Sequence, residues 1–488
     1  MSTYSSAVFP TETITLPAGP ETIVRGGRQL FPLLDRGFAG VRRIGVLGWG
    51  PQGRAQALNL RDSLAGTKIT VSVGLRPGSA SAAAARAEGF TEEAGTLGDW
   101  LDVAAASDLL LILISDAALA EHYPEIFAAV RQGATIGLSH GFLIGHLAEV
   151  GDQLPQGVGV IAVCPKGMGD SVRRLYLQGA EVNGAGINAS FAVEVDHDGH
   201  GVDRALAWSI ALGAPYTFPT DLRSEYLSDI VGERGILLGA VHGIVEALFR
   251  RFRAAGDDPE RAYLRSCENI TGPIAAAISD RGLRLLRDDL AGPDRAIFDQ
   301  AYAACYPVAT ELITEIYDEV EAGTELRSVI LAGHRLRRTP MSEINRSPMW
   351  AVAKEIREGR PGRTVPIDPY TAGVFVATMI AQVDLFAGKG HAWSEIINES
   401  IIEAVDSLLP YLHARDVGYM IDNCSTTARL GARRWGPRFQ AVLEQIVFPA
   451  TDEADIPDPE LVKNFDTNPA HDALAVIAEL RPSVKIAL

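Results

Sequence analysis

Short apolar runs alternate with helical segments along residues 41–163, and this alternation is the feature that most limits the fold of the chain. Buried strands are predicted at residues 41–47, 68–75, 109–115, 134–138 and 159–163, with helices at 55–64, 80–88 and 121–130. Strands that alternate with helices form βαβ units, and right-handed crossovers wind such units into a doubly wound parallel sheet. We therefore predict an α/β domain in this part of the chain.

The strand signal ends at about residue 219, and helical periodicity takes its place. Helices are predicted at residues 226–253, 259–280, 295–321, 370–386 and 394–412, with Pro- and Arg-rich connectors at 340–348 and 360–369. We place the domain boundary near Ala214. Residues 1–213 then form the α/β domain with an irregular N-terminal arm (residues 1–40), and residues 214–488 form a large all-α domain.

The all-α half carries a faint internal similarity. A long apolar helix at 235–251 is followed by SCENITG at 266–272, and another at 371–386 is followed by INESIIE at 397–403. The second copy has Glu399 and Glu403, whereas the first has Glu268 and then Gly272. A diverged duplication (about 214–335 and 336–488) and a shared helix-hairpin pattern explain this about equally well.

Charge and cysteine usage exclude several classes of protein. The chain has 61 acidic and 44 basic residues and a net charge of −17, so nucleic acid and anionic membranes are poor partners. Its four cysteines form no CxxC pair, which argues against structural zinc and a disulfide framework. We find no signal peptide, no transit peptide and no apolar run of about 18 residues. A cytoplasmic protein is expected.

A glycine-rich turn follows the first strand of the α/β domain. Gly48, Trp49, Gly50, Gln52 and Gly53 belong to a GxGxxG motif between a predicted strand and a predicted helix. Such glycines let the backbone approach a pyrophosphate, which the N–H groups of the helix N-terminus then bind. The motif alone is also found in ordinary turns, but this context predicts a dinucleotide site.

The end of the second strand selects the cofactor. An acidic residue there binds the ribose of NAD, whereas this chain has Arg76, Ser79 and Ser81, which suit the 2′-phosphate of NADP. An exposed loop arginine beside two turn serines is the alternative. We count Ser115 and Asp116, at the end of the third strand, among the cofactor contacts.

Two carboxylate pairs stand out in the all-α half. Asp229 and Glu233 lie four residues apart, as do Glu399 and Glu403, and Glu395 extends the second row. One such pair is most often a solvated helix face. Two pairs within apolar sequence instead bring like charges together near a core, which requires a cation. Oxygen ligands of this kind suit Mg²⁺.

Polar residues also follow the fourth and fifth strands. His140 and Lys166 come directly after these strands, and ligands of doubly wound sheets bind at the carboxyl ends of the strands. A lone histidine is more often structural and a lone lysine more often exposed, but this placement favours function. Asp422 or Ser425 begins a helix as its N-cap, or Ser425 offers its hydroxyl to a substrate.

With these residues in view, the chain resembles the ketol-acid reductoisomerase (acetohydroxyacid isomeroreductase) family in its long, plant-like form. The resemblance covers nearly the whole chain from about Ile23. It is carried by long stretches such as GWGPQGRAQALNLRDSL at 48–64, CPKGMGDSVRRLY at 164–176 and DNCSTTARLG at 422–431. It implies a knotted, duplicated helical domain, a homo-oligomer (dimer or tetramer) and an enzyme of branched-chain amino acid biosynthesis.

The resemblance also implies a reaction and residue roles. An alkyl group migrates in 2-acetolactate or 2-aceto-2-hydroxybutyrate with Mg²⁺, and NADPH then reduces the product to a 2,3-dihydroxy acid. Asp229 would bridge two Mg²⁺ ions, Glu233 would bind the first, and Glu399 and Glu403 would lie near the second. The remaining implied residues are catalytic His140 and Lys166, substrate-binding Ser425, and cofactor contacts at Gln52, Arg76, Ser79, Ser81 and Gly169.

Two other functions share part of this pattern. A metal-independent NADP-dependent hydroxy-acid dehydrogenase has the same two kinds of domain and would keep full activity in EDTA. A non-enzymatic NADP-binding module would bind NADPH without turnover, but it leaves both carboxylate pairs without a purpose.

Overall fold

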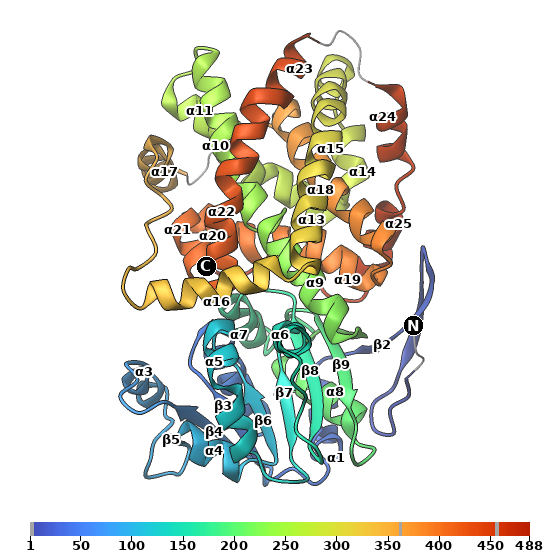
Figure 1. Ribbon diagram of the computed structural model, residues 1–488. Coiled ribbons are helices and arrows are strands. Elements are labelled where there is room, and N and C mark those ends of the chain that lie inside the picture. Colours follow the sequence, from blue (N-terminus) through green and yellow to red (C-terminus); the bar gives the residue numbers. More distant parts are fainter. Residues whose placement is uncertain (1–3, 361–363, 454–457) are drawn as a thin grey trace. The chain divides into compact units, whose positions relative to one another are not determined.

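A computed structural model describes residues 4–360, 364–453 and 458–488 of the chain (Figure 1). The described residues divide into two compact units. The sheet unit takes its residues from 1–226, 323–339 and 478–487, and the helical unit takes its residues from 227–322 and 340–477. The two units are described separately below.

Six parallel strands form the centre of the sheet unit. They are β3 (Arg43–Leu47), β4 (Thr70–Leu75), β5 (Leu97–Asp99), β6 (Leu109–Ile112), β7 (Thr135–Leu138) and β8 (Gly159–Pro165). Their order in the sheet is β5-β4-β3-β6-β7-β8, with Ile44 opposite both Val71 and Leu109. Strand order therefore reverses between β3 and β6, where doubly wound sheets bind dinucleotides. The expected fold of this half is confirmed.

Four more strands extend the sheet beyond β8. They are β9 (Ala189–Val195), β10 (Tyr216–Pro219), β2 (Gly19–Arg25) and β1 (Glu12–Leu16); β9 runs antiparallel to β8, and β2 runs antiparallel to β10. The expectation of an irregular N-terminal arm was wrong, because β1 and β2 form a hairpin. Ile14, Leu16 and Ile23 of this hairpin are buried, and Gly19 takes a φ of +126° at its turn.

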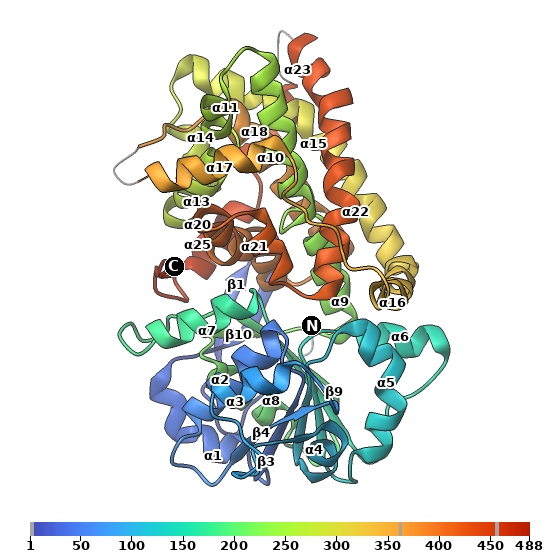
Figure 2. The ribbon, with the colours of Figure 1, turned by 90° about the vertical axis from the view of Figure 1, so that its left-hand side faces the viewer.

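Helices cover both faces of the sheet (Figure 2). On one face lie α1 (Leu34–Gly37), α2 (Pro51–Ser63) and α8 (Gly201–Leu212), and on the other lie α4 (Trp100–Ala106), α5 (Asp116–Ala129) and α6 (Phe142–Val150). Each face has its own apolar core, with Trp208 in the first and Trp100 in the second. The unit also contains η1 (Arg28–Leu33), α3 (Ser81–Ala87) and α7 (Gly169–Gln178).

Two later segments also belong to the sheet unit, so its division from the helical unit differs from the expected boundary at Gly213/Ala214. Strand β10 lies beyond that boundary, because it pairs with β9 and β2. Helix α16 (Thr324–Leu336) packs against α5 and α6, where Arg327 pairs with Glu149 at 3.0 Å. The C-terminal segment 478–487 lies along α7, where Gln178 binds the main chain of Lys485 and Ala487.

The helical unit is built mainly from four long helices: α10 (Gly239–Ala254), α15 (Gly292–Glu321), α18 (Pro369–Lys389) and α22 (Thr426–Val442) (Figure 1). The chain enters this unit within α9 (Leu222–Arg234). Shorter segments complete it: α11 (Pro259–Arg265), α12 (Cys267–Asn269), η2 (Ile270–Ile274), α13 (Ala275–Arg281), α14 (Leu283–Asp288), α17 (Pro348–Gly359), α19 (Trp393–Ile397), η3 (Asn398–Leu408), α20 (Leu409–Ala414), α21 (Val417–Asp422), η4 (Leu443–Val447), α23 (Phe448–Glu453), α24 (Pro459–Asp466) and α25 (Ala470–Ala478).

The two predicted repeats exchange partners in this unit. Helix α10 of the first packs against α22 of the second, and α18 of the second packs against α15 of the first. Both motifs singled out in the sequence run into π-helix, η2 after Glu268 and η3 around Glu399. The duplication, its alternative of a shared helix-hairpin pattern, and the knot all stay predictions. Residues 361–363 of the connector expected at 360–369 lie outside the described residues.

The sequence has no uninterrupted apolar run of about 18 residues, as expected, but helix α18, which contains Gln382 and Asp384, is apolar enough on average to be tested as a membrane span. It is the one helix in the described part of the chain that meets that test by length and composition. Most of its most apolar window (78%) is buried inside the structure. A core helix meets the same test, and the packing of α18 against α15 is that of a core helix.

Candidate active site

The glycine-rich turn joins β3 to α2 at the switch point of the sheet. A Cβ on Gly48, which has a φ of +102°, would lie 2.5 Å from the carbonyl oxygen of Leu113, and one on Gly53 would lie 2.7 Å from that of Gly48. A Cβ on Gly50 would meet no atom within 4 Å. Gly48 and Gly53 are therefore required by packing, whereas Gly50 borders open space at the N-terminus of α2. This arrangement fits a pyrophosphate group.

Two residues expected to touch the cofactor join this turn to the loop after β8. The Gln52 side-chain amide donates a hydrogen bond to the carbonyl oxygen of Gly167 (2.8 Å). A Cβ on Gly169 would lie 2.2 Å from the carbonyl oxygen of Pro51, so α7 begins directly against the start of α2. Only a glycine permits this approach.

The end of β4 carries the expected phosphate-binding residues. Arg76 is exposed, its guanidinium lies 5.9 Å from the Trp100 ring centre, and the Ser79 hydroxyl accepts a hydrogen bond from the N–H of Ser81. Ser81 and Trp49 line an open cleft of about 750 Å³, and the buried indole N–H of Trp49 has no hydrogen-bond partner. The Arg76 guanidinium, which also lies 3.4 Å from His122 Nε2, supplies an exposed positive charge. This charge, the two serine hydroxyls and the indole N–H of Trp49 fit a phosphorylated nucleoside. Ser115 and Asp116 lie at the start of α5.

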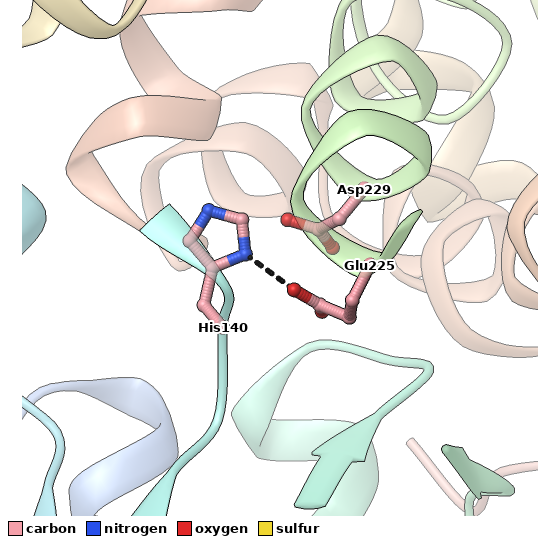
Figure 3. Close-up of side chains that lie close together, drawn as sticks. All are labelled: His140, Glu225 and Asp229. Carbon is pink, nitrogen blue, oxygen red and sulfur yellow. Dashed lines mark hydrogen bonds and ion pairs between the residues drawn. The ribbon is translucent and has the colours of Figure 1, made fainter. Parts of the chain in front are cut away.

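His140 and Lys166 follow β7 and β8 as expected, and both contact a third residue, Glu225 of α9. Figure 3 shows the contact between His140 and Glu225, with Asp229 beside them. The Glu225 carboxylate lies 3.1 Å from His140 Nδ1 and 3.4 Å from Lys166 Nζ, and it accepts a hydrogen bond from the N–H of Gly141 at 2.6 Å. The side chains of Lys166 and Glu225 are each 1% exposed, whereas that of His140 is 20% exposed.

This buried group is held together by charge. Burial opposes ionisation of Glu225, but the Lys166 ammonium and His140 outweigh it and lower the pKa of Glu225 to about 2. Gly141 allows the approach, since a Cβ there would lie 2.0 Å from the carbonyl oxygen of Leu222 at the start of α9. The sequence prediction missed Glu225. The available signal was spacing, because Glu225 lies four residues before Asp229 and extends its row as Glu395 extends the other.

The carboxylates of the helical unit gather around the start of α22. The pKa of the Cys424 thiol is raised well above its usual value, first by burial and then by Glu233, Glu403 and Asp229, so all three lie within electrostatic reach of it. The Ser425 hydroxyl lies 3.3 Å from a carboxylate oxygen of Glu233. Asp229 and Glu233 come from α9 and Glu403 from η3, so the structure brings the first predicted pair and one member of the second to the surroundings of Cys424.

Glu399 is the buried member of these pairs. Its residue is 0% exposed, and a Cβ on Gly232 of α9 would lie 3.3 Å from its carbonyl oxygen. The segment that holds it is π-helix rather than the predicted α-helix. Such wide turns are rare and recur at functional sites. Ser425 is also the N-cap of α22, where its hydroxyl accepts a hydrogen bond from the N–H of Ala428. The N-cap interpretation is confirmed, whereas the substrate role of this hydroxyl stays a prediction.

Two family models match the chain. "Acetohydroxy acid isomeroreductase, NADPH-binding domain" matches residues 40–217, and "Ketol-acid reductoisomerase, C-terminal domain" matches residues 222–362. The chloroplastic ketol-acid reductoisomerases of Spinacia oleracea and Pisum sativum are 52% and 51% identical to the chain. Each alignment spans 99% of this chain and 83% or 85% of the relative.

A solved structure supports the fold. An NADH-preferring ketol-acid reductoisomerase from an uncultured archaeon superposes with a TM-score of 0.56 at 23% identity, over 65% of this chain and 94% of that one. These comparisons do not favour the alternative of a metal-independent hydroxy-acid dehydrogenase.

The same comparisons correct the expected location. Both plant relatives are named chloroplastic and align over nearly the whole chain, so the expectation of a cytoplasmic protein was wrong. That expectation depended on the first residues of the sequence. The folded domains do not by themselves indicate the compartment in which a protein works. Two family models match this chain, and relatives that are 51–52% identical align over 99% of its length, so the chain belongs to the ketol-acid reductoisomerase family.

Proposed function

We propose that α9 is the helix on which this chain carries out the family's two-step conversion of an acetohydroxy acid. The observation that supports this is the row Glu225, Asp229 and Glu233, which repeats every four residues along α9. Glu225 binds the two polar residues at the strand ends, and Glu233 contacts Ser425. One helix thus carries both the residues suited to proton transfer and those suited to a metal.

The donors around α9 fit Mg²⁺, the metal of this family. They are carboxylate oxygens from two helices, and the nearby Cys424 thiol stays protonated because burial raises its pKa. An all-oxygen set with no thiolate is the set that Mg²⁺ prefers. We assign the two Mg²⁺ ions to Asp229, Glu233, Glu399 and Glu403, whose carboxylates would hold them. When bound, the metal polarises the substrate ketone and stabilises the alkoxide that develops during migration.

The sheet unit would hold NADPH along the carboxyl ends of its strands. Gly50 and the N-terminus of α2 receive the pyrophosphate, and Arg76, Ser79 and Ser81 receive the 2′-phosphate. Ser115, Asp116 and the backbone of Gly169 complete the contacts. Gln52 acts mainly on the protein itself, because its amide already binds Gly167.

Glu225, Glu233 and Ser425 would orient the reacting groups or transfer protons. Glu225 fixes the Lys166 ammonium and accepts a hydrogen bond from His140 Nδ1–H, which leaves Nε2 as the acceptor of that imidazole. Glu233 is the base that takes the substrate hydroxyl proton as the alkyl group moves. The Ser425 hydroxyl, exposed at the N-terminus of α22, donates to the substrate carboxylate.

The test follows NADPH oxidation with racemic 2-acetolactate, with Mg²⁺ and then with EDTA, and with NADH in parallel. Consumption that requires both Mg²⁺ and NADPH supports the proposal, whereas full activity in EDTA overturns it. Glu233→Gln should abolish isomerisation but keep NADPH binding. Glu343→Gln is the matched control, because Glu343 is an exposed carboxylate of the same unit whose side chain is 78% exposed. An active Glu233→Gln enzyme would contradict the assigned role.

Besides NADPH and Mg²⁺, the proposed reaction requires only its small-molecule substrate. We propose that the protein binds neither nucleic acid nor membrane, which its net charge of −17 and the burial of α18 support. We also propose a homo-oligomer, a dimer or a tetramer. Light scattering of the purified full chain tests the assembly.

A further inference from the structure

A single buried amide lies between the two segments that carry the carboxylates. Gln382 of α18 is 0% exposed, and its side-chain NH₂ donates to the carbonyl oxygen of Glu399 (3.0 Å) and to the hydroxyl of Ser400 (3.3 Å). Its side-chain oxygen accepts the N–H of Ile236 (3.0 Å), three residues after Glu233. One side chain thus binds the backbone of η3 at Glu399 and the backbone beyond the end of α9.

The local chain is shaped to receive this amide. A Cβ on Gly235 would lie 2.2 Å from Gln382 Oε1, so only glycine leaves room for the oxygen. A Cβ on Gly232, one turn earlier, would come within 3.3 Å of the Glu399 carbonyl. The end of α9 and the start of η3 therefore approach each other closely on both sides of Gln382.

The hydrogen bonds fix the orientation of the amide. Turning it over would set its NH₂ against the N–H of Ile236 and its oxygen against the carbonyl of Glu399, two repulsive contacts. Gln382 also stands between Ala381 and Val383 in an apolar helix, where an amide is costly to bury unless its partners satisfy it. Packing alone would favour an apolar residue at this position. We therefore attribute the glutamine to its hydrogen bonds with Ile236, Glu399 and Ser400.

We propose that Gln382 is a positioning residue for the metal site, which sets the distance between the carboxylates of α9 and those of η3. This inference rests on the proposed metal role of Asp229, Glu233, Glu399 and Glu403. Gln382 contacts none of those carboxylates and acts through the backbone that carries them. Residues that orient metal ligands in this way are worth about 10–100-fold in metal affinity.

Gln382→Met tests the proposal, because methionine has a similar length and volume but makes no hydrogen bond to Ile236 or Glu399. We would titrate the full chain with Mn²⁺, a paramagnetic substitute for Mg²⁺, and measure free Mn²⁺ by electron paramagnetic resonance without substrate. The dissociation constant should rise about tenfold or more. NADPH affinity, measured by its fluorescence, should stay unchanged. Ser400→Ala, which removes only the 3.3 Å contact, should change neither.

Asn269 provides a matched control for a buried amide. It is 1% exposed, its NH₂ donates to the carbonyl of Pro366 (2.8 Å), and its oxygen accepts the N–H of Asp368 (2.9 Å). It follows Glu268 in the repeat that lacks the carboxylate pair. Asn269→Leu should lower Tm about as much as Gln382→Met does but leave Mn²⁺ binding as in wild type.

A second variant disturbs the contact of the Gln382 amide oxygen from the segment that follows α9. Gly235→Ala places a methyl group against Gln382 Oε1 and should weaken Mn²⁺ binding as Gln382→Met does, which keeps the test open if one variant folds poorly. Wild-type Mn²⁺ affinity in both variants, or an equal loss in Asn269→Leu, would overturn the role of Gln382. Asp229→Asn separates the two claims, because unchanged Mn²⁺ binding in that variant would overturn the metal assignment itself.

Discussion

Replacing Glu225 by glutamine removes one charge from the buried group that Glu225 forms with His140 and Lys166. The shape is nearly kept, and the new amide oxygen still accepts the N–H of Gly141, which lies 2.6 Å from the present carboxylate. The Lys166 ammonium, however, loses the anion 3.4 Å away while its side chain stays 1% exposed. An unpaired buried charge is strongly destabilising, so we expect the sheet unit to lose stability and the enzyme to lose activity.

The size of the effect follows from the ionisation of Glu225. Burial raises its pKa, but Lys166 and His140 together lower it from 4.5 to about 2. A pKa change of this size corresponds to roughly 3 kcal/mol, which agrees with the ~3–5 kcal/mol expected for breaking a buried ion pair. Because the pKa is lowered in the folded state, this contribution is present above about pH 4.5 and is lost as the pH falls towards 2.

Thermal unfolding of the wild type, Glu225→Gln, Lys166→Met and the double variant measures this energy as a double-mutant cycle near neutral pH. At roughly 2–4 °C per kcal/mol for a unit of this size, Glu225→Gln should lower Tm by roughly 6–12 °C. The double variant should recover most of that loss, since it buries no unpaired charge, yet stay inactive. Additive changes in Tm, or a Glu225→Gln protein as stable as wild type, would refute the reasoning.

Other predictions concern the cofactor, the metal and a buried histidine. Arg76→Ala should raise KM for NADPH by about 10–100-fold and leave KM for NADH nearly unchanged, because a charge-assisted bond to phosphate is worth ~1.5–3 kcal/mol; equal changes for both cofactors would contradict a 2′-phosphate role. EDTA should lower Tm, and Mg²⁺ should restore it, in the wild type but not in Asp229→Asn. Burial lowers the pKa of His242 from 6.5 to about 4. Because the unfolded chain takes up this proton first, the wild type loses stability as the pH falls from 6.5 to 4, and His242→Gln should lose less in thermal scans over the same range.

Much of the sheet unit could be predicted because its signals are local. The five predicted strands became β3, β4, β6, β7 and β8, since each is a continuous apolar run buried on both faces. The hairpin β1–β2 was missed although Ile14 and Leu16 alternate with polar residues. Pro17 and Ala18 instead form the turn between the two strands.

The breaks in the helical unit could not be predicted, because their causes are distant in sequence. The helix expected at 226–253 is divided into α9 and α10, and the division lies where Gln382, more than a hundred residues later, binds Ile236. The π-helical form of η3 could not be predicted either, because helical periodicity does not distinguish a π-helix from an α-helix. Glu225 was missed for a related reason: its spacing is visible, but its partners come from the ends of β7 and β8.

The two repeats resolve the same electrostatic problem in different ways. Glu268 of the first is 3% exposed, and Arg360 binds it with two hydrogen bonds of 2.6 and 2.7 Å, so the chain itself supplies the cation. In the second, Glu399 is as deeply buried, and Glu403 shares the surroundings of Cys424 with Asp229 and Glu233. Arg234 lies 3.4 Å from a carboxylate oxygen of Glu233. We propose that Mg²⁺ has the role near Glu399 and Glu403 that Arg360 has beside Glu268, because each supplies positive charge to buried carboxylates.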